Sequence, residues 1–431
     1  MHSLPDALTA LAGVAGADAI RPPVDTDAID GVRPSVVVEP GSADAVAHVL
    51  GWASSQRLAV VVRGGGTKMG WGQPPGPIDI LLSTRRLARV LAHAHGDLTA
   101  TVESGVTLRS MNETLAIERQ WLPLESACDE ATVGGLLATN DAGALQHRFG
   151  TPRDLLIGVG LATTDGRLVK AGGTVVKNVA GYDLGKLVTG SFGSLAVIVN
   201  ATFKLTPMAA ASGTCRVGCA TPEAAAETAS ALAAGRLDPI ALDVRADTAP
   251  AGASRGPGHS PIELLVRFAS TPPVVEGQID DAVGLLKAQG VGPIARVSGA
   301  DEAALWRAQA SDVWETGDVV VKVNWLPASL DRVLALVADL GRQGRVRFAG
   351  RVGLGAGLLG ITSSPQAQMA AVGRLREHGN VLTRAVVRHA AAEVKAAIDV
   401  WGPLGSPAAL LHAIKQAFDP HGILNAGRGP L

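Results

Sequence analysis

The chain of 431 residues carries 38 Lys and Arg against 39 Asp and Glu, and this near balance predicts no electrostatic surface for nucleic acid. It contains no run of about 18 apolar residues that would span a bilayer, and its N-terminus lacks the basic region of a signal peptide. Three cysteines indicate a reducing compartment and are too few for an iron–sulfur cluster, which needs about four thiolates. We therefore predict a cytoplasmic protein with two or three domains.

The first predicted elements form a βαβ unit that ends in a glycine-rich loop. A strand at 35–40 precedes a helix with Ser42 as its N-cap, and the strand "LAVVV" (58–62) follows. That strand runs directly into "RGGGTKMGWG" (63–72). Three adjacent glycines cost backbone entropy and supply no packing, so a close approach of the backbone to a ligand is the usual reason to keep them.

The loop 63–72 could belong to one of three kinds of phosphate site. A P-loop is excluded because the lysine follows Gly66-Thr67, and a Rossmann turn is excluded because "WGQPPGP" cannot open a helix. A nest of converging backbone N–H groups remains, with a simple tight turn as the alternative. A second glycine-bearing segment, "TVGGLLATNDAGA" (132–144), favours the nest, because two loops could hold a diphosphate from two sides.

The next elements predict antiparallel sheets. A strand at 78–83 precedes a hairpin at 87–103 and a helix at 107–119, and a second hairpin turns at Asp165-Gly166. Beyond about residue 207 the pattern becomes strand, helix, strand, repeated, which predicts a ferredoxin-like layer with helices on one face.

Two motifs are set aside. Gly355, Gly357 and Gly360 match G-x-G-x-x-G, but the surrounding residues alternate like a hairpin where a dinucleotide site requires a helix. His93 and His95 lie beside a turn with no third ligand nearby in the sequence, so we interpret them as an exposed hairpin end. No metal site is predicted.

Four segments give the chain a family resemblance. In order, they are "VVRGGGTKMGWG", "ATVGGLLATNDAG", "VVKNVAGYDLGKLVTGSFGSLAVI" and "FDPHGILNAGR". Together they resemble the FAD-binding superfamily of vanillyl-alcohol oxidase and p-cresol methylhydroxylase (PCMH), and within it the E-type subunit of bacterial glycolate oxidase. The resemblance implies an α+β chain: a two-subdomain PCMH-type FAD-binding domain (1–207), a ferredoxin-like antiparallel α+β cap domain (208–400) and a C-terminal segment (401–431) that returns to the flavin.

The resemblance also implies the residues that contact FAD. The first loop and the second loop would hold the pyrophosphate, a following segment would pass the ribityl region, and others would reach the isoalloxazine ring and the adenine. The implied residues are Arg63, Gly64, Gly65, Gly66, Thr67, Lys68 and Met69 in the first loop; Thr132, Gly134 and Gly135 in the second; Asp141, Ala142 and Gly143 near the ribityl chain; Ala180, Gly181, Tyr182 and Asp183 near the ring; Ile198 at the adenine; and Asn425 at the flavin. Arg428 would stabilise the reduced, anionic ring.

Departures from the family pattern carry predictions of their own. Thr67 stands where many relatives have the histidine that links FAD, so we predict non-covalent FAD. Some relatives attach FAD through a second covalent link, to a cysteine close before the second loop. Cys128 lies four residues before Thr132, which is farther than that pattern requires. The His-rich metal segment of some 2-hydroxy-acid dehydrogenases corresponds to "AGRVGLGAGLLG", which has neither histidine nor carboxylate. No metal-assisted removal of the substrate's hydroxyl proton can be built from it.

The resemblance implies a function in 2-hydroxy-acid oxidation. The leading hypothesis is an FAD-binding subunit of a glycolate oxidase complex, with a homologous flavin subunit and an iron–sulfur subunit as partners and any membrane association through them. Lys322 and Arg351 are the candidate carboxylate anchors, and His421 is a weak candidate base. Trp306, Trp314 and Trp325 are candidate docking anchors in the cap domain. A self-sufficient D-2-hydroxy-acid dehydrogenase and a non-catalytic flavoprotein scaffold remain as alternatives.

Overall fold

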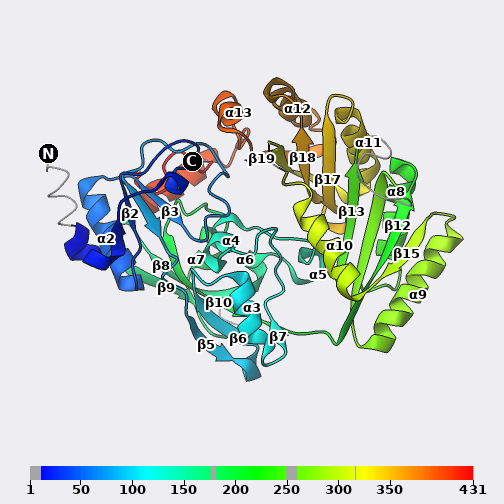
Figure 1. The fold of residues 1–431 in the computed structure, drawn as a ribbon, viewed down its shortest axis with the longest axis horizontal. Coiled ribbons are helices and arrows are strands. Elements are labelled where there is room, and N and C mark those ends of the chain that lie inside the picture. Colours follow the sequence, from blue (N-terminus) through cyan, green and yellow to red (C-terminus); the bar gives the residue numbers. More distant parts are fainter. Residues whose placement is uncertain (1–10, 176–180, 249–259, 316, 431) are drawn as a thin grey trace. The chain divides into compact units, whose positions relative to one another are not determined.

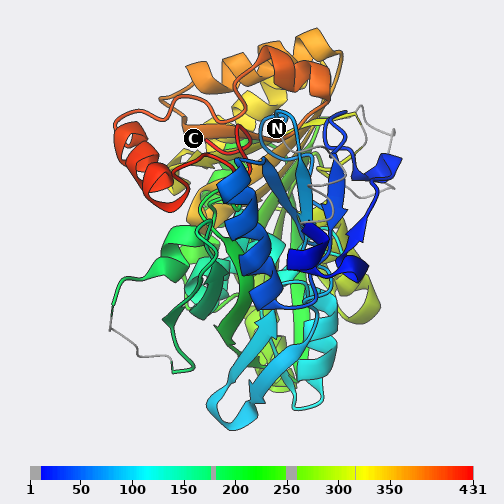
Figure 2. The same cartoon turned by 90° about the vertical axis from the view of Figure 1, so that its left-hand side faces the viewer.

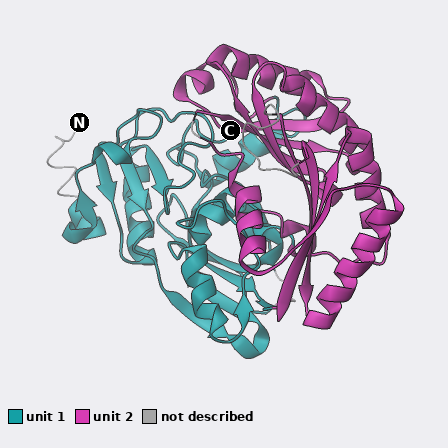
Figure 3. Ribbon diagram, turned by 45° about the vertical axis from the view of Figure 1, so that its right-hand side comes forward, with its two compact units in different colours: residues 1–142, 150–208, 403–431 teal, residues 143–149, 209–402 magenta. Residues whose placement is uncertain are grey.

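The computed structural model describes residues 11–175, 181–248, 260–315 and 317–430 (Figure 1). The chain divides into two compact units (Figure 3). Unit 1 comprises residues 1–142, 150–208 and 403–431, and unit 2 comprises 143–149 and 209–402. The short segment 143–149 therefore groups with unit 2, although the chain on both sides of it belongs to unit 1. The sequence did not indicate that 143–149 belongs to unit 2.

The first sheet of unit 1 contains the predicted βαβ unit. Its strand order is β1 (Ile20–Arg21), β2 (Val36–Val38), β4 (Ile80–Ser83) and β3 (Val60–Arg63), and β2 and β3 both run parallel to β4. Helix α2 (Ala43–Gln56) faces the viewer in blue in Figure 2. The predicted cap is confirmed, because the Ser42 hydroxyl accepts a hydrogen bond from Ala45 N at 3.2 Å. Val46, Val49 and Leu50 are fully buried on the packed side of α2.

The second sheet of unit 1 is antiparallel and contains both predicted hairpins. Its strand order is β5 (Val90–Ala94), β6 (Thr99–Glu103), β10 (Val197–Lys204), β8 (Leu156–Ala162) and β9 (Leu168–Gly172). Helices α3 (Leu108–Ala116) and α4 (Val133–Thr139) pack their apolar residues into the core of this sheet. The shorter elements are η1 (Ala17–Ala19), η2 (Asp25–Asp27), η3 (His95–Asp97), β7 (Gln120–Trp121), α6 (Pro152–Leu155), α7 (Leu184–Val188) and β11 (Thr206–Pro207).

The C-terminal segment returns to the first sheet of unit 1. After α14 (Ala408–Phe418) the chain runs beside β3, where Val60 N donates to Ile423 O and Asn425 N donates to Val60 O, each at 2.8 Å. Lys415 Nζ holds the turn by donating to the carbonyl of Leu424 at 3.0 Å. This pairing brings residues 423–428 to the end of β3, where the first glycine loop begins.

Unit 2 is built on one eight-stranded antiparallel sheet. Its order is β15 (Ile294–Val297), β12 (Ala211–Cys219), β14 (Ile262–Ser270), β13 (Ala241–Asp247), β17 (Arg345–Arg351), β18 (Ala356–Thr362), β16 (Val319–Trp325) and β19 (Leu382–His389). The other elements are α5 (Gln146–Phe149), α8 (Pro222–Ala234), α9 (Pro272–Ala288), α10 (Gly299–Ser311), η4 (Pro327–Ser329), α11 (Leu330–Leu340), η5 (Val352–Leu354), α12 (Pro365–Glu377) and α13 (Ala392–Ala397).

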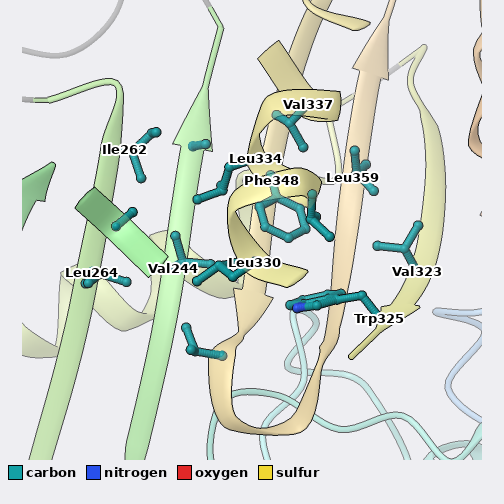
Figure 4. Close-up of a cluster of buried hydrophobic side chains, with 14 of the residues drawn as sticks. Val244, Ile262, Leu264, Val323, Trp325, Leu330, Leu334, Val337, Phe348 and Leu359 are labelled. Carbon is teal, nitrogen blue, oxygen red and sulfur yellow. The ribbon is translucent and has the colours of Figure 1, made fainter. Parts of the chain in front are cut away.

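The two faces of this sheet differ in chemistry because side chains alternate along each strand. One face forms the main core of unit 2 with α8, α9, α11 and α12. Figure 4 shows Val244, Leu264 and Phe348 from the sheet against Leu330 and Leu334 from α11. The opposite face carries buried charged residues and is partly covered by α10. These residues are Asp243, Arg245, Asp247, Glu263, Arg347 and Arg351.

The structure of unit 2 tests two expectations from the sequence. The G-x-G-x-x-G match lies on a β-hairpin, as predicted, with Gly355 at its turn (φ +58°). The proposed tryptophan anchors are wrong for two positions, because Trp306 is 6% exposed and Trp325 is 3% exposed. Trp325 packs on Phe348 in the core, with ring centroids 5.7 Å apart. Side chains buried in this way are not available to a docking partner.

Candidate cofactor site

Unit 1 contains a cavity where the first glycine loop, helix α4 and the C-terminal segment meet. The loop and α4 each contribute to the wall of the cavity. The rest of the wall is formed by Phe192, Asn425 and Arg428. The lining residues are Val62, Gly64, Gly65, Gly66, Thr67, Lys68, Met69, Thr132, Gly135, Ala138, Thr139, Phe192, Asn425 and Arg428. All four segments that carry the family resemblance therefore contribute to one cavity, the third of them through Phe192 alone.

The glycines of the first loop are required by contact between the two loops. A Cβ on Gly64 would lie 2.2 Å from the hydroxyl oxygen of Thr132, and a Cβ on Gly65 would lie 1.9 Å from the carbonyl oxygen of Glu130. Gly66 has φ +84°, a backbone conformation that side-chain-bearing residues rarely adopt. The backbone of the first loop does approach another group closely, as expected, but that group is the second loop of the protein and not a ligand. Contact of these glycines with a phosphate remains a prediction.

The second glycine segment forms the start of α4. Thr132 is the N-cap, and its hydroxyl accepts a hydrogen bond from Gly135 N at 3.3 Å. A Cβ on Gly134 would lie 2.8 Å from the Cβ of Ser104, so this glycine lets α4 pack on the neighbouring chain. Gly134 does not line the cavity, whereas Thr132 and Gly135 do.

Both cations of the first loop are paired with carboxylates. Arg63 Nη1 donates to Asp27 Oδ1 at 2.7 Å, and Lys68 Nζ lies 3.3 Å from Asp141 Oδ2. Lys68 also lies over the Trp71 ring, 5.5 Å from its centroid. The pairing of Lys68 with Asp141 connects the first loop to the segment that follows α4. Because these charges are already compensated, the backbone N–H groups are the donors that the loop can offer to an anion.

Two residues of the C-terminal segment hold the cavity together. Asn425 Oδ1 accepts from Val62 N at 3.2 Å, and its Nδ2 donates to Phe192 O at 2.5 Å. Arg428 is 5% exposed and donates to the carbonyls of Met69 and Trp71. Burial lowers the pKa of Arg428 to about 10, which still leaves the guanidinium charged at neutral pH. This cation lines the cavity, and its contact with the flavin remains a prediction.

The remaining predicted cofactor residues are not among those that line this cavity. Tyr182 is 92% exposed, and Asp183 caps α7 by accepting from Lys186 N at 3.0 Å. Ile198 is buried in the second sheet opposite Leu161. Their roles stay predictions, as do those of Ala142, Gly143 and Gly181, and Ala180 lies outside the described residues.

Sequence reasoning missed four residues that line the cavity: Val62, Ala138, Thr139 and Phe192. Phe192 has φ +57°, which is unusual for an aromatic residue, and it is held there by its backbone bond to Ala138 O at 2.8 Å. The flanking glycines in "TGSFGS" were an available signal for an unusual backbone. Ala138 and Thr139 lie on one side of a helix that the sequence had described only as a glycine segment.

Unit 2 carries a second notable group on the charged face of its sheet. Arg351, at the end of β17, is 6% exposed. Within the described part of the chain its Nε has no hydrogen-bond partner, and its Nη1 reaches only the carbonyl of Ala349, at 3.5 Å. Asp243 is its cross-strand neighbour on β13 and instead accepts from Gln309 at 2.9 Å. Lys322 lies on the same face two strands away.

Comparison with known proteins identifies the cofactor. Residues 34–172 match the FAD binding domain family, and residues 405–428 match the C-terminal domain of FAD linked oxidases. The chain carries an FAD-binding domain. These ranges include the first loop, α4, Asn425 and Arg428, so the family matches and the cavity identify the same part of the chain.

The fold of this FAD-binding protein is that of the PCMH family, as the resemblance predicted. The solved structure of p-cresol methylhydroxylase with substrate bound superposes with a TM-score of 0.74 at 16% identity, over 98% of this chain and 96% of that one. The α+β fold class, with a PCMH-type fold, is thereby confirmed.

Curated relatives at higher identity align with part of this FAD-binding chain. D-lactate dehydrogenase of Archaeoglobus fulgidus is 35% identical over 40% of this chain and 39% of its own length. Glycolate oxidase subunit GlcD of Bacillus subtilis is 30% identical over 49% and 45%, and subunit GlcE of Escherichia coli is 31% identical over 44% and 53%. The chain thus spans about half or less of these three. D-2-hydroxyglutarate dehydrogenase of Xanthomonas citri pv. viticola aligns over 92% and 89%, at 28% identity.

The residues of the cavity fit FAD. A loop of three glycines presents its backbone N–H groups, and the buried Arg428 supplies positive charge at the same cavity, as an anionic cofactor requires. Within the described ranges, no group of three or more His, Cys, Asp or Glu side chains is placed to hold a metal ion. No helix in the same ranges is long and apolar enough to cross a membrane.

Proposed function

We propose that this chain is the FAD-binding subunit of an assembly that oxidises glycolate or a related 2-hydroxy acid to the 2-oxo acid. FAD held at the cavity of the first glycine loop, Asn425 and Arg428 would supply the oxidising equivalent, so that the substrate would lose a hydride from the carbon that bears the hydroxyl group and a proton from the hydroxyl. Relatives named as D-lactate and D-2-hydroxyglutarate dehydrogenases and as glycolate oxidase subunits support this class of substrate.

The observation that carries the proposal is the state of Arg351. A guanidinium that is 6% exposed and makes no ion pair among the described residues is costly, because burial removes its water while its cross-strand neighbour Asp243 bonds Gln309 instead. A carboxylate ligand would supply two acceptors in the geometry that Arg prefers. Arg351 would therefore bind and orient the acid group of the substrate, with Lys322 on the same face as the second candidate.

The position of Arg351 in the sequence strengthens this role. It belongs to "AGRVGLGAGLLG", the segment that corresponds to the His-rich metal segment of some relatives. A fixed cation at this place would take over the binding of the substrate's negative charge without a metal ion. Arg428, buried at the FAD cavity in unit 1, would supply positive charge to the reduced flavin.

Anaerobic flavin reduction tests the activity. The purified FAD-loaded chain is mixed with glycolate, D-lactate or D-2-hydroxyglutarate, and loss of the visible flavin absorbance is followed. Arg351→Met should raise the half-saturating acid concentration by about 10- to 100-fold, the loss expected for one charge-assisted contact, while FAD content stays unchanged. Arg384→Met is the matched control, because Arg384 is exposed on β19, the edge strand of the same sheet. Equal effects of the two variants would contradict the role of Arg351.

The same experiment separates the alternatives. A chain that alone turns over glycolate at full rate with an artificial acceptor is a self-sufficient dehydrogenase. A flavin that no acid reduces, either alone or with co-purified partners, belongs to a scaffold. For the proposed assembly, affinity purification at native expression should recover a homologous flavin subunit and a protein with several Cys-x-x-Cys-x-x-Cys runs.

A further inference from the structure

A buried carboxylate lies behind the first FAD loop, in a part of the chain outside the family match at 34–172. Asp27 ends the short helix η2 and is 2% exposed. Its Oδ2 accepts from Arg21 Nη1 at 2.7 Å and from Val24 N at 2.8 Å. Its Oδ1 accepts from Arg21 Nη2 at 3.0 Å and from Arg63 Nη1 at 2.7 Å. Both oxygens are therefore fully engaged.

Asp27 thereby fixes the residue at which the loop begins. Arg63 is held at its side chain by Asp27 and at its carbonyl by Thr84 N, which donates at 2.9 Å. The next two residues, Gly64 and Gly65, have no room to move toward the second loop, since even a Cβ would collide there. A shift of Arg63 would consequently be transmitted to the backbone that lines the cavity.

We propose that Asp27 is a positioning residue for FAD, which acts by holding and neutralising Arg63 so that the first glycine loop keeps the shape that receives the diphosphate. Without the carboxylate, the half-buried Arg63 charge would lack its partner and the entry to the loop would relax. The N-terminal segment around η2 then forms part of the cofactor site, although none of its residues lines the cavity.

The ionisation of Asp27 is compatible with this role across the physiological range. Hydrogen bonds from Arg21, and then from Val24 N and Arg63, outweigh burial and hold the pKa of Asp27 well below its usual range. Arg21, Arg63 and, beside Arg21, Glu39 are the charged groups around it. A lowered pKa in the folded state means that the contribution is complete above the unfolded value of about 4 and is lost only as pH falls below it. FAD affinity should therefore show no step from this group between about pH 5 and 8.

The test measures FAD binding to the apo form of the whole chain, and the quenching of flavin fluorescence reports the binding. Asp27→Asn should raise the Kd for FAD by about tenfold or more, the loss expected for one charge-assisted contact. Asp25→Asn is the matched control, because Asp25 lies in the same helix with its side chain 98% exposed and should leave the Kd unchanged. A Kd for Asp27→Asn within twofold of the wild-type value, or a tighter one, would overturn the proposal.

A double-mutant cycle separates positioning from general stabilisation. Asp27→Asn combined with Arg63→Gln should weaken FAD binding no more than the stronger single change, because both act through one contact. Arg21→Gln should leave the Kd within about threefold, since Arg21 reaches Asp27 but not the loop. Additive effects at 27 and 63, or an Arg21→Gln loss equal to that of Asp27→Asn, would reject the role of Arg63. If Asp27→Asn does not fold, Arg63→Gln decides alone, and a wild-type Kd for it refutes the proposal.

Discussion

Gly65 offers the sharpest test of how the two glycine loops form the FAD cavity. Gly65→Ala adds one methyl group whose carbon would lie 1.9 Å from the carbonyl oxygen of Glu130, where real contacts essentially never fall below 3.0 Å. The two backbones must separate by about 1 Å, and neither can swing away as a flexible side chain would. Overpacking of this kind costs about 1–3 kcal/mol, which corresponds to about a 5- to 150-fold change in an equilibrium constant.

In the proposed site the cost should appear mainly in FAD affinity, because the apo loops can relax apart, whereas we expect a bound diphosphate to need both loops in place. We expect the Kd of Gly65→Ala to rise by about 10- to 100-fold while far-UV circular dichroism stays unchanged. Gly76→Ala is the matched control, since a Cβ there meets nothing within 4 Å. Wild-type FAD affinity together with wild-type thermal stability in Gly65→Ala would refute the reasoning, because the strain would then have no consequence.

The remaining predictions concern the cofactor linkage, the thiols and the core of unit 2. Acid precipitation should release all flavin into the supernatant, since a threonine replaces the linking histidine, and a yellow pellet would contradict this. Burial raises the pKa of Cys215 and of Cys219 to about 11, so at pH 8 a thiol reagent should label Cys128 alone in the native protein and all three cysteines after denaturation. Phe348→Ala should destabilise unit 2 by about 3–5 kcal/mol in urea unfolding, whereas Ile117→Ala, 79% exposed in unit 1, should stay within about 0.5 kcal/mol.

Local features of the sequence were sufficient for much of the fold. The Ser42 cap, the hairpin turn at Asp165-Gly166 and the strand character of 355–360 each depend on residues within a few positions of one another. Capping and turn chemistry act over such distances, and the alternation of apolar residues reports the buried side of each element directly. The ordered motifs then identified the FAD-binding domain, because their backbone requirements are uncommon in combination.

Contacts between distant segments were decided only by the tertiary structure. Nothing in the sequence pairs Gly65 with Glu130 or Asp27 with Arg63, and no local pattern shows that Trp306 is buried or that Arg351 makes no ion pair within the described residues. These contacts depend on how strands order themselves within sheets and on where loops meet at their edges. A glycine or a charged residue has the same local signature whether its partner is a phosphate, another backbone or a carboxylate, and only the path of the chain selects among them.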